Sequence, residues 1–360
     1  MQQILKLLVP VTLLLTACAT TKSNGEKGLK DYYKDYFDIG VALPTRNFSE
    51  AETSFFKKHF NSVTAENAMK IQPIQPVQNQ YNFAPVDSLV AVTRRLNMKM
   101  RGHTLCWHNQ VPDWFFKRED GSTIDKATLY DRLKTHIYTV AGRYKNDIYA
   151  WDVVNEVISD KKEEFYRPSK FYEIAGADYI DSAYTWAHEA APDALLFYND
   201  YNEIDSTKRS KIIQMIRGLQ AKNIPVHGIG LQAHWALNEP SESQLEQTLK
   251  DFSALGLNIQ ITELDMSIYP KEHQSREWDA ARDKNTLYTN DIANAQAEKY
   301  AMFFKLFRKY SKQISSVTFW NISDKHSWLD DFPVKNRKDY PLLFDKDLQP
   351  KKAYEAVIDF

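Results

Sequence analysis

Two glutamates that each follow a run of apolar residues are the most reactive feature of this sequence. One ends the stretch Trp151-Asp152-Val153-Val154-Asn155-Glu156, and the other ends Ile259-Gln260-Ile261-Thr262-Glu263. Two carboxyl groups facing one cleft can cleave a glycosidic bond, because one protonates the leaving oxygen while the other attacks the anomeric carbon or activates water. A carboxyl separation of about 5 to 5.5 Å would give retention of configuration, and one of about 6.5 to 9.5 Å would give inversion.

The pair also predicts a division of labour. An ionised Glu263 disfavours ionisation of a neighbouring Glu156, which then stays protonated and acts as the acid. Once a sugar esterifies Glu263, that charge is gone, and Glu156 can serve as the base for incoming water. Asn155 can donate to the sugar 2-hydroxyl. A lone glutamate would be interpreted as a solvated or salt-bridged side chain, but two in polar clusters favour Glu156 as acid/base and Glu263 as nucleophile.

Eight short runs rich in β-branched and aromatic residues predict the strands that position these groups. The runs are Asp38 to Leu43, Phe60 to Ala65, Lys99 to Cys106, Ile148 to Val154, Ala194 to Tyr198, Val226 to Leu231, Asn258 to Thr262 and Ser316 to Trp320. Amphipathic helical spacing lies between them, as in Leu129, Leu133, Ile137 and Val140, or in Ile212, Ile213, Ile216 and Leu219. This alternation predicts an α/β fold, a single-domain (β/α)8 TIM barrel.

A TIM barrel gathers its chemistry at the C-terminal ends of its strands, because the loops that follow the strands converge there. The predicted ends carry Glu66 and Asn67, then His103, Trp107 and His108, then Asn155 and Glu156, then Asn199 to Asn202, then Gln232 and His234, then Glu263 and Asp265, and last Trp320. Carboxylates, amides, imidazoles and indoles therefore share one rim. Amides can bond hydroxyl groups and flat rings can cover sugar faces, so this rim suits a carbohydrate.

Composition argues for a neutral ligand. Lys and Arg number 46 against 47 for Asp and Glu, so there is no basic field for a nucleic acid. Aromatic residues make up 13% of the chain, which suits sugars, although a packed core accounts for them equally well. The sequence has no zinc-finger spacing, no HExxH and no Gly-rich phosphate loop, so we expect no metal or nucleotide cofactor.

The N-terminus reads as an export signal of the lipoprotein type. Lys6 precedes an apolar stretch from Leu7 to Leu15, and Leu15-Thr16-Ala17-Cys18 resembles the lipobox whose Cys is acylated. An ordinary signal with a chance Cys is the alternative. The stretch is too short for a permanent membrane helix. We therefore expect a signal over 1–18, a polar tether over 19–30 and a catalytic barrel over 31–360, in a monomer exported and lipid-anchored through Cys18 in a bacterial envelope. Cys106 is expected to be a buried small hydrophobe.

Five ordered motifs resemble those of glycoside hydrolase family 10 xylanases, and the likeness covers nearly all of Asp38 to Ile358. They are Thr64-Ala65-Glu66-Asn67 with Lys70, Gly102-His103-Thr104-Leu105-Cys106-Trp107-His108 with Gln110, Trp151 to Glu156, Gly230-Leu231-Gln232-Ala233-His234, and Ile261-Thr262-Glu263-Leu264-Asp265. The resemblance implies a retaining endo-β-1,4-xylanase without cofactor, acting on xylan and xylo-oligosaccharides. It implies that Glu156 is the acid/base, that Glu263 is the nucleophile, and that His234 hydrogen-bonds Glu263 and holds it ionised.

The resemblance also implies positions around the sugars. Lys70, His103, Trp107, Asn155, Gln232, Trp320 and Trp328 would surround the sugar at the cleaved position, and Glu66, Asn67 and Gln110 would bind the next sugar toward the non-reducing end. Asp265 is expected to orient its neighbours, and Asp152 is a candidate for a core salt bridge. Tyr201 is a candidate on the leaving-group side or a packed loop aromatic. His108 is either a supporting residue or a substrate contact.

Two features depart from the family pattern. Asn321 follows Trp320 where many relatives have Gly, and the segment from Tyr269 to Thr289 is long and charged. Three alternative functions stay open at this point: a glucanase or mannanase with the same carboxylates, a non-catalytic glycan-binding lipoprotein, and a structural envelope protein. The cluster of Glu66, Asn67 and Lys70 disfavours the first, because it favours xylose. Retention of both glutamates disfavours the second, and the polar rim is unexplained by the third.

Overall fold

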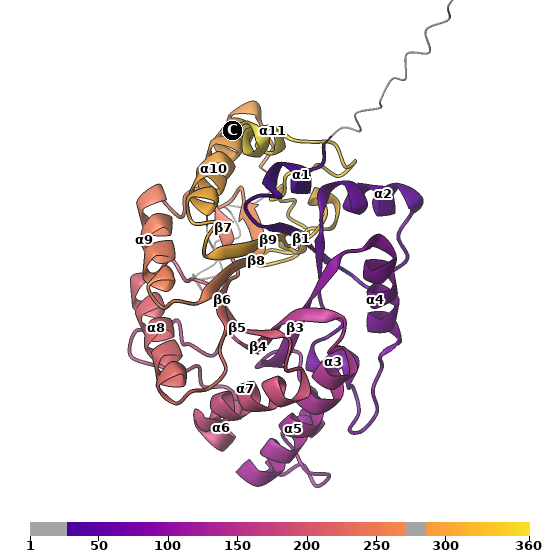
Figure 1. Cartoon of the computed structure of the whole chain (residues 1–360), viewed down its shortest axis with the longest axis vertical. Coiled ribbons are helices and arrows are strands. Elements are labelled where there is room, and N and C mark those ends of the chain that lie inside the picture. The colour runs from indigo at the N-terminus through magenta and orange to yellow at the C-terminus, as the bar shows by residue number, and fades with distance from the viewer. Residues whose placement is uncertain (1–26, 271–285) are drawn as a thin grey trace, which may run out of the picture.

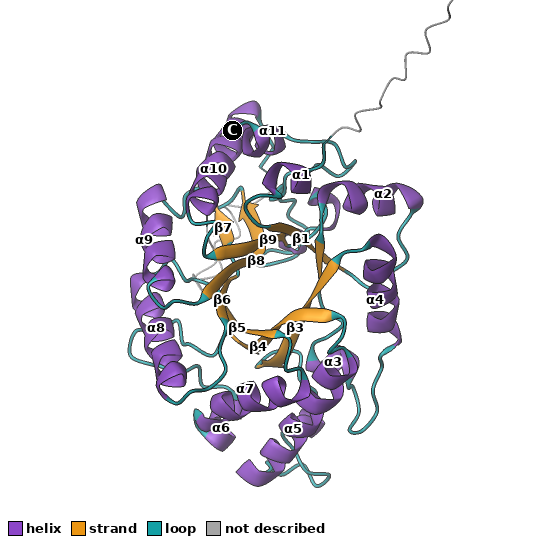
Figure 2. Ribbon diagram, in the orientation of Figure 1, coloured by secondary structure: helices purple, strands orange, loops and turns teal. Residues whose placement is uncertain are grey.

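The computed structural model describes residues 27–270 and 286–360. Within them, eight parallel strands form a closed barrel that is surrounded by helices (Figure 1, Figure 2). The barrel strands are β1 (Asp38–Leu43), β2 (Ser62–Ala65), β3 (Lys99–Trp107), β4 (Ile148–Asn155), β5 (Leu195–Asp200), β6 (Gly228–Leu231), β8 (Asn258–Ser267) and β9 (Ile314–Phe319). Pairing of β1 with β9 and of β6 with β8 closes the ring. The predicted single-domain TIM barrel is confirmed.

All eight predicted strands are present, but several run further toward the rim than predicted. β8 continues to Ser267 instead of ending at Thr262, because the short strand β7 (His234–Ala236) pairs with its second half, with His234 opposite Asp265. Glu263 therefore lies inside a strand. β5 continues to Asp200, where the prediction ended at Tyr198. Asn199 is consequently part of the barrel wall.

The helices lie outside the strands, and several of them begin at a side chain that caps the first turn. They are α1 (Leu29–Tyr33), α2 (Glu50–His59), α3 (Ile71–Ile74), α4 (Ala84–Leu96), α5 (Lys126–Arg143), α6 (Lys170–Ala175), α7 (Asp178–Ala190), α8 (Ser206–Ala221), α9 (Glu242–Ser253), α10 (Asn290–Lys309) and α11 (Lys352–Ile358). The side chains of Ser49, Asp125, Asp205, Ser241 and Thr289 each accept a backbone N–H from the first turn that follows. The helical stretches predicted around Leu133 and Ile216 are α5 and α8.

Close packing fixes the strands that carry the site. Trp151 on β4 is fully buried, and its indole lies against Gly102 on β3. A β-carbon at Gly102 would come within 2.2 Å of that ring, so only glycine fits at this position. Cys106 on the same strand is also buried, which confirms its prediction as a small core residue.

The folded chain begins earlier than predicted. α1 starts at Leu29, which is fully buried, and a β-carbon on Gly28 would lie 1.7 Å from the carbonyl oxygen of Lys58. The Tyr33 hydroxyl donates to the carbonyl of Val357 in α11. The predicted tether, which extended to Lys30, is therefore wrong at its C-terminal end, because residues 28–30 are packed against the barrel.

Several predictions lie outside the described residues. These are the signal over 1–18, the acylated Cys18 and most of the charged segment 269–289, of which 271–285 are not described. In the described part of the chain, no helix has the length and apolar character needed to cross a membrane.

Candidate active site

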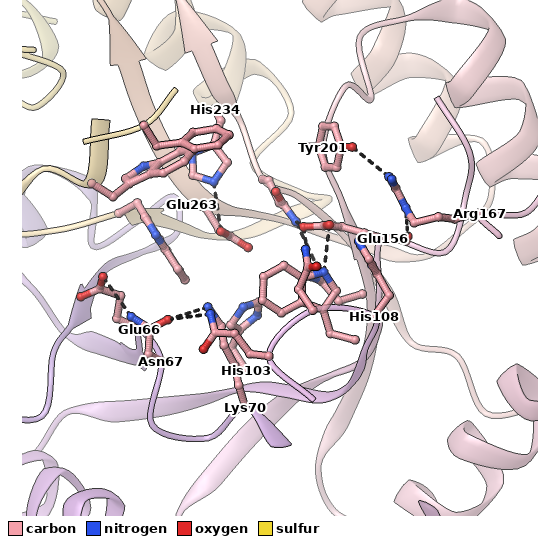
Figure 3. A pocket seen from close by; sticks show the side chains of 18 residues that line it. Glu66, Asn67, Lys70, His103, His108, Glu156, Arg167, Tyr201, His234 and Glu263 are labelled. Atoms are coloured by element: carbon pink, nitrogen blue, oxygen red, sulfur yellow. Dashed lines mark hydrogen bonds and ion pairs between the residues drawn. The ribbon is translucent and has the colours of Figure 1, made fainter. Parts of the chain in front are cut away.

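The predicted site residues meet in one cavity of about 480 Å³ at the C-terminal rim of the barrel. Its lining consists of Glu66, Asn67, Lys70, His103, Trp107, His108, Asn109, Gln110, Asn155, Glu156, Arg167, Tyr201, Gln232, His234, Glu263, Trp320, Trp328 and Phe332. Every predicted site residue of the barrel except Asp265 is among them. Figure 3 shows Glu66 and Asn67 at one end, Tyr201 and Arg167 at the other, and the two glutamates between. The cavity is thus an elongated cleft that the carboxylates divide.

Glu263 is 5% exposed, and a donor faces each of its carboxyl oxygens. His234 Nε2 lies 3.1 Å from Oε2, and Asn199 Nδ2 donates to Oε1 over 2.8 Å. Burial disfavours the carboxylate, but the hydrogen bond from His234 and nearby positive charge, including that of Lys70, outweigh it and lower the pKa of Glu263 to about 2. Glu263 is therefore a carboxylate at neutral pH, as a nucleophile must be.

His234 is held by a second carboxylate behind it. Its Nδ1 lies 3.0 Å from Asp265 Oδ1, and Trp328 Nε1 donates to Asp265 Oδ2 over 2.7 Å. Burial disfavours the imidazolium, but the charges of Asp265 and Glu263 outweigh it and raise the pKa of His234 to about 10. Asp265 does not line the cleft. It orients the imidazolium and Trp328, which do line it.

Glu156 follows β4 directly and has φ +57°, a left-handed conformation that costs a residue with a β-carbon about 1–3 kcal/mol. Its carboxyl accepts from Trp107 Nε1 over 2.9 Å and from Gln232 Nε2 over 2.9 Å. Asn155 Nδ2 lies 3.2 Å from the same oxygen that accepts from Gln232. The donors around this carboxyl are therefore an indole and two amides, all of them neutral.

A buried amide links the two glutamates. Asn199 Nδ2 donates to Asn155 Oδ1 over 3.0 Å as well as to Glu263, and Thr262 Oγ1 donates to Asn199 Oδ1 over 2.6 Å. This contact turns the NH₂ of Asn155 toward Glu156 and the cleft. Space for the arrangement comes from Gly230, because a β-carbon there would lie 2.3 Å from Asn199 Oδ1.

At one end of the cleft, Lys70 and two amides form a hydroxyl-binding cluster. Lys70 Nζ donates to Asn67 Oδ1 over 2.8 Å and lies 4.8 Å from the centre of the Trp107 ring. Asn67 donates to Glu66 over 3.2 Å, and Gln110 Nε2 lies 3.3 Å from Asn67 Oδ1. Burial lowers the pKa of Lys70 and raises that of Glu66. The sequence brings these residues together from the loops after β2 and β3.

His103 and Trp320 both line the cleft together with Glu263. Their rings meet edge to face with centres 5.5 Å apart. His103 Nδ1 lies 2.9 Å from Asp152 Oδ2, and Asp152 is fully buried in a bidentate ion pair with Arg101. The predicted core salt bridge of Asp152 is confirmed, and it also fixes the orientation of His103.

Tyr201 and His108 lie at the opposite end of the cleft. The Tyr201 hydroxyl donates to Asp160 Oδ2 over 2.5 Å and accepts from Arg167 Nη2 over 2.8 Å, and Lys208 Nζ lies 3.8 Å from the centre of the Tyr201 ring. His108 packs edge to face against Trp107, and burial lowers its pKa to about 4, so it is neutral at pH 7. Its Nδ1 has no hydrogen-bond partner among the described residues.

Asn321, which follows Trp320 and departs from the family pattern, supports the backbone of its own turn. Its φ is +139°, a region that glycine adopts readily. The side chain compensates by capping the local backbone: Oδ1 accepts from the N–H of Ile322 over 2.9 Å, and Nδ2 donates to the carbonyl of His326 over 3.0 Å. The asparagine thus keeps the turn that carries the loop toward Trp328.

Four residues of the site were not predicted, namely Asn109, Arg167, Asn199 and Phe332. Asn199 stood at a predicted strand end but had no role assigned. The only indication in the sequence that its side chain points into the site was Gly230 on the neighbouring strand, which leaves room for it. Arg167 and Phe332 lie in loops, where no periodicity marks them. Phe332 is 48% exposed and stacks on Trp328 with ring centres 5.2 Å apart. Within the described residues, no group of three or more His, Cys, Asp and Glu side chains is arranged to hold a metal ion.

Two glutamates across a cleft of amides, indoles and a lysine at a TIM-barrel rim define a glycoside hydrolase. The model of glycosyl hydrolase family 10 matches residues 28–360, and the chain belongs to this family. It is 44% identical over 326 residues to endo-1,4-beta-xylanase B of Paenibacillus barcinonensis, covering 91% of this chain and 96% of the relative. It is 42% identical over 331 residues to the endo-1,4-beta-xylanase of Geobacillus stearothermophilus, covering 92% and 98%.

Solved structures agree. The crystal structure of xylanase XynB from Paenibacillus barcinonensis, complexed with a conduramine derivative, matches with a TM-score of 0.87 at 43% identity, covering 93% of this chain and 99% of that one. An endo-1,4-beta-xylanase from Caldicellulosiruptor owensensis matches with a TM-score of 0.86 at 42% identity, covering 93% of this chain and 100% of that one.

Proposed function

We propose that this protein is a retaining endo-β-1,4-xylanase that hydrolyses internal bonds of xylan and xylo-oligosaccharides by double displacement. The observation that carries the proposal is the pair of Glu156 and Glu263 in one cleft, linked through Asn155 and Asn199. Family membership and the xylanase names of the relatives point to the same activity.

In the first half of the reaction, Glu263 attacks the anomeric carbon while Glu156 protonates the leaving oxygen. The depressed pKa of Glu263 keeps it ionised for this attack. Its negative charge is lost as the glycosyl ester forms, and His234 and Asn199 remain as hydrogen-bond donors beside its two oxygens. Asn155 directs its NH₂ into the cleft, where it can donate to the 2-hydroxyl as charge develops on the sugar.

In the second half, Glu156 is the base for the water that releases the sugar from Glu263. The neutral donors from Trp107 and Gln232 hold the Glu156 carboxyl in the cleft during both steps. Trp320 and Trp328 offer apolar faces to the sugar at the cleaved position, with His103 and Lys70 as polar contacts. Glu66, Asn67 and Gln110 bind the next sugar toward the non-reducing end, and Tyr201 the leaving-group side.

The test is hydrolysis of β-1,4-xylan, cellulose and mannan by the full-length protein, followed as reducing ends and oligosaccharides. We expect xylan-selective release of mixed oligomers, with the β-anomer as the first product, and loss of release in Glu263→Ala. Glu246→Ala is a matched control, because this glutamate lies on α9 and pairs only with Lys309 among the described ion pairs. Preference for cellulose or mannan, an α-anomeric first product, or no release at all would reject the proposal.

Export and anchoring are part of the proposal. The segment 1–18 would direct export, Cys18 would be acylated, and the barrel would act as a monomer at the bacterial envelope. Metabolic labelling with a fatty acid should mark the wild-type protein and leave Cys18→Ala unlabelled. Labelling that persists in Cys18→Ala would reject the anchor but leave the xylanase assignment intact.

A further inference from the structure

The acid/base Glu156 holds a backbone conformation that its neighbours must maintain. Its φ of +57° is disfavoured for any residue with a β-carbon, and it marks the point where β4 turns into the loop 156–169. Two hydrogen bonds clamp the peptide groups of this residue. Its N–H donates to the carbonyl of Asn199 over 2.9 Å, and its carbonyl accepts from Arg167 Nε over 2.9 Å.

The first clamp comes from the barrel and the second from the loop. Asn199 belongs to β5, so its carbonyl is fixed by the sheet. Arg167 is the only side chain that donates to the Glu156 carbonyl in the described part of the chain. The orientation of the acid/base peptide therefore depends on how well Arg167 itself is fixed.

Arg167 is fixed at several points. Its backbone N–H donates to the carbonyl of Val157 over 2.8 Å, and its Nη2 donates to the Tyr201 hydroxyl over 2.8 Å and to Asp160 Oδ2 over 3.0 Å. Asp160 in turn accepts from Lys208 over 2.8 Å and from Asn202 over 3.1 Å. The guanidinium thus joins the Glu156 peptide to Tyr201 on the loop after β5 (Figure 3) and, through Asp160, to Lys208 on α8.

We infer that Arg167 is a positioning residue for the acid/base, which aims the Glu156 carboxyl at the leaving oxygen by holding the Glu156 carbonyl. The inference rests on the proposed function, because it takes Glu156 as the proton donor. Arg167 acts here through the backbone of Glu156 and needs no contact with the substrate. Its planar guanidinium suits this task, because Nε and Nη2 donate in fixed, divergent directions that a lysine ammonium does not reproduce.

Positioning of a proton donor has a signature that a general structural role lacks. A leaving group that is already a stable anion, such as 2,4-dinitrophenolate, departs without protonation, whereas phenolate or a sugar alkoxide needs the acid. A displaced Glu156 carboxyl therefore lowers kcat/KM, which reports the first half of the reaction, only for the second kind of substrate. Loss of fold or of substrate binding would slow both kinds equally.

The experiment compares kcat/KM for 2,4-dinitrophenyl and phenyl β-xylobioside in full-length wild type, Arg167→Met and Arg167→Lys. General acid catalysis is worth about 10²- to 10⁴-fold, so partial displacement in Arg167→Met should lower kcat/KM for the phenyl substrate about 10- to 100-fold. We expect less than about a three-fold loss for the dinitrophenyl substrate, since proton donation contributes little there. Arg167→Lys should lie between wild type and Arg167→Met.

Arg118→Met is the matched control. Arg118 also donates to a backbone carbonyl, that of Thr123, and to a carboxylate, that of Asp125, both over 2.7 Å, but it does not line the cleft. It should leave both substrates unaffected.

Equal losses on the two substrates, or no loss on either, would overturn the inference. If thermal melting shows that Arg167→Met does not fold, the same ratio measured in Arg167→Lys decides the question. A failure of the proposed function is distinct, because wild type itself would then hydrolyse neither xyloside nor xylan.

Discussion

The surroundings of the two glutamates differ in both backbone and charge. Glu263 lies within β8, flanked along that strand by β6, β7 and β9, and its carboxyl faces an imidazolium. Glu156 lies where β4 becomes a loop, in a left-handed conformation, and its carboxyl receives hydrogen bonds from neutral groups. A nucleophile must stay ionised, whereas an acid/base must gain and lose a proton in each cycle. A fixed positive charge therefore suits the nucleophile, and neutral hydrogen-bond donors suit the acid/base.

We expect the largest effect from replacing each glutamate by alanine, and this comparison distinguishes the nucleophile from the acid/base. Glu263→Ala should lower kcat/KM by about 10⁴-fold or more on every substrate, because no covalent intermediate can form. Glu156→Ala should lose about 10²- to 10⁴-fold on xylan and phenyl xylobioside but retain kcat/KM on 2,4-dinitrophenyl xylobioside. The measurement is steady-state kinetics on the two aryl substrates. If both variants lost activity equally on both substrates, the division of roles would be wrong.

The next effect tests the charge that surrounds Glu263. His234→Gln keeps a donor near Oε2 but removes the positive charge, so the pKa of Glu263 should rise from about 2 toward its ordinary value of 4.5. The acid limb of kcat/KM should move to higher pH, and activity at neutral pH should fall about 10²-fold, since groups that support a nucleophile act with it. A pH profile in which the acid limb does not move would contradict the electrostatic account.

The ion pair of Glu263 and His234 predicts how the free energy of unfolding varies with pH. The folded pKa of Glu263 is lowered from 4.5 to about 2, so its contribution is complete above pH 4.5 and is lost as pH falls through 2. The folded pKa of His234 is raised from 6.5 to about 10, so its contribution is complete below pH 6.5 and is lost as pH rises through 10. The difference in unfolding free energy between wild type and His234→Gln should therefore be largest between these limits, near pH 5 to 6. Denaturant titrations across pH measure it.

The sequence was sufficient to predict the barrel and the residues along its rim. Strand periodicity and the alternation with helices located all eight strands, and polar residues at their ends located the cleft. It did not predict how the side chains pair. The extension of β8 depends on β7, whose three residues are too few to show periodicity. Arg167 is brought to the Glu156 carbonyl by the loop 156–169, and loop paths follow from tertiary contacts that no local pattern encodes.

The smallest effect tests the buried amide that links the two environments. Asn199→Asp keeps the size of the side chain but replaces the donor to Glu263 Oε1 and Asn155 Oδ1 with a negative charge. This charge should raise the pKa of Glu263 and move the acid limb of kcat/KM upward, by less than in His234→Gln because His234 still supplies its charge. The Asn155 amide also loses its anchor, and we expect a fall in kcat/KM of about ten-fold, as for loss of one transition-state hydrogen bond.

A second readout isolates the part of this effect that passes through Asn155. If Asn199 acts by aiming the Asn155 NH₂ at the 2-hydroxyl, its replacement should matter less on a 2-deoxy substrate, which has no hydroxyl there. Asn294→Asp on the exposed face of α10 is the control for an added charge elsewhere. It should change neither the acid limb of kcat/KM nor the ratio of kcat/KM between the ordinary substrate and the 2-deoxy substrate. An unmoved acid limb together with the same loss on both substrates would show that Asn199 only packs the barrel wall, and the two glutamates would then be electrostatically independent at this point.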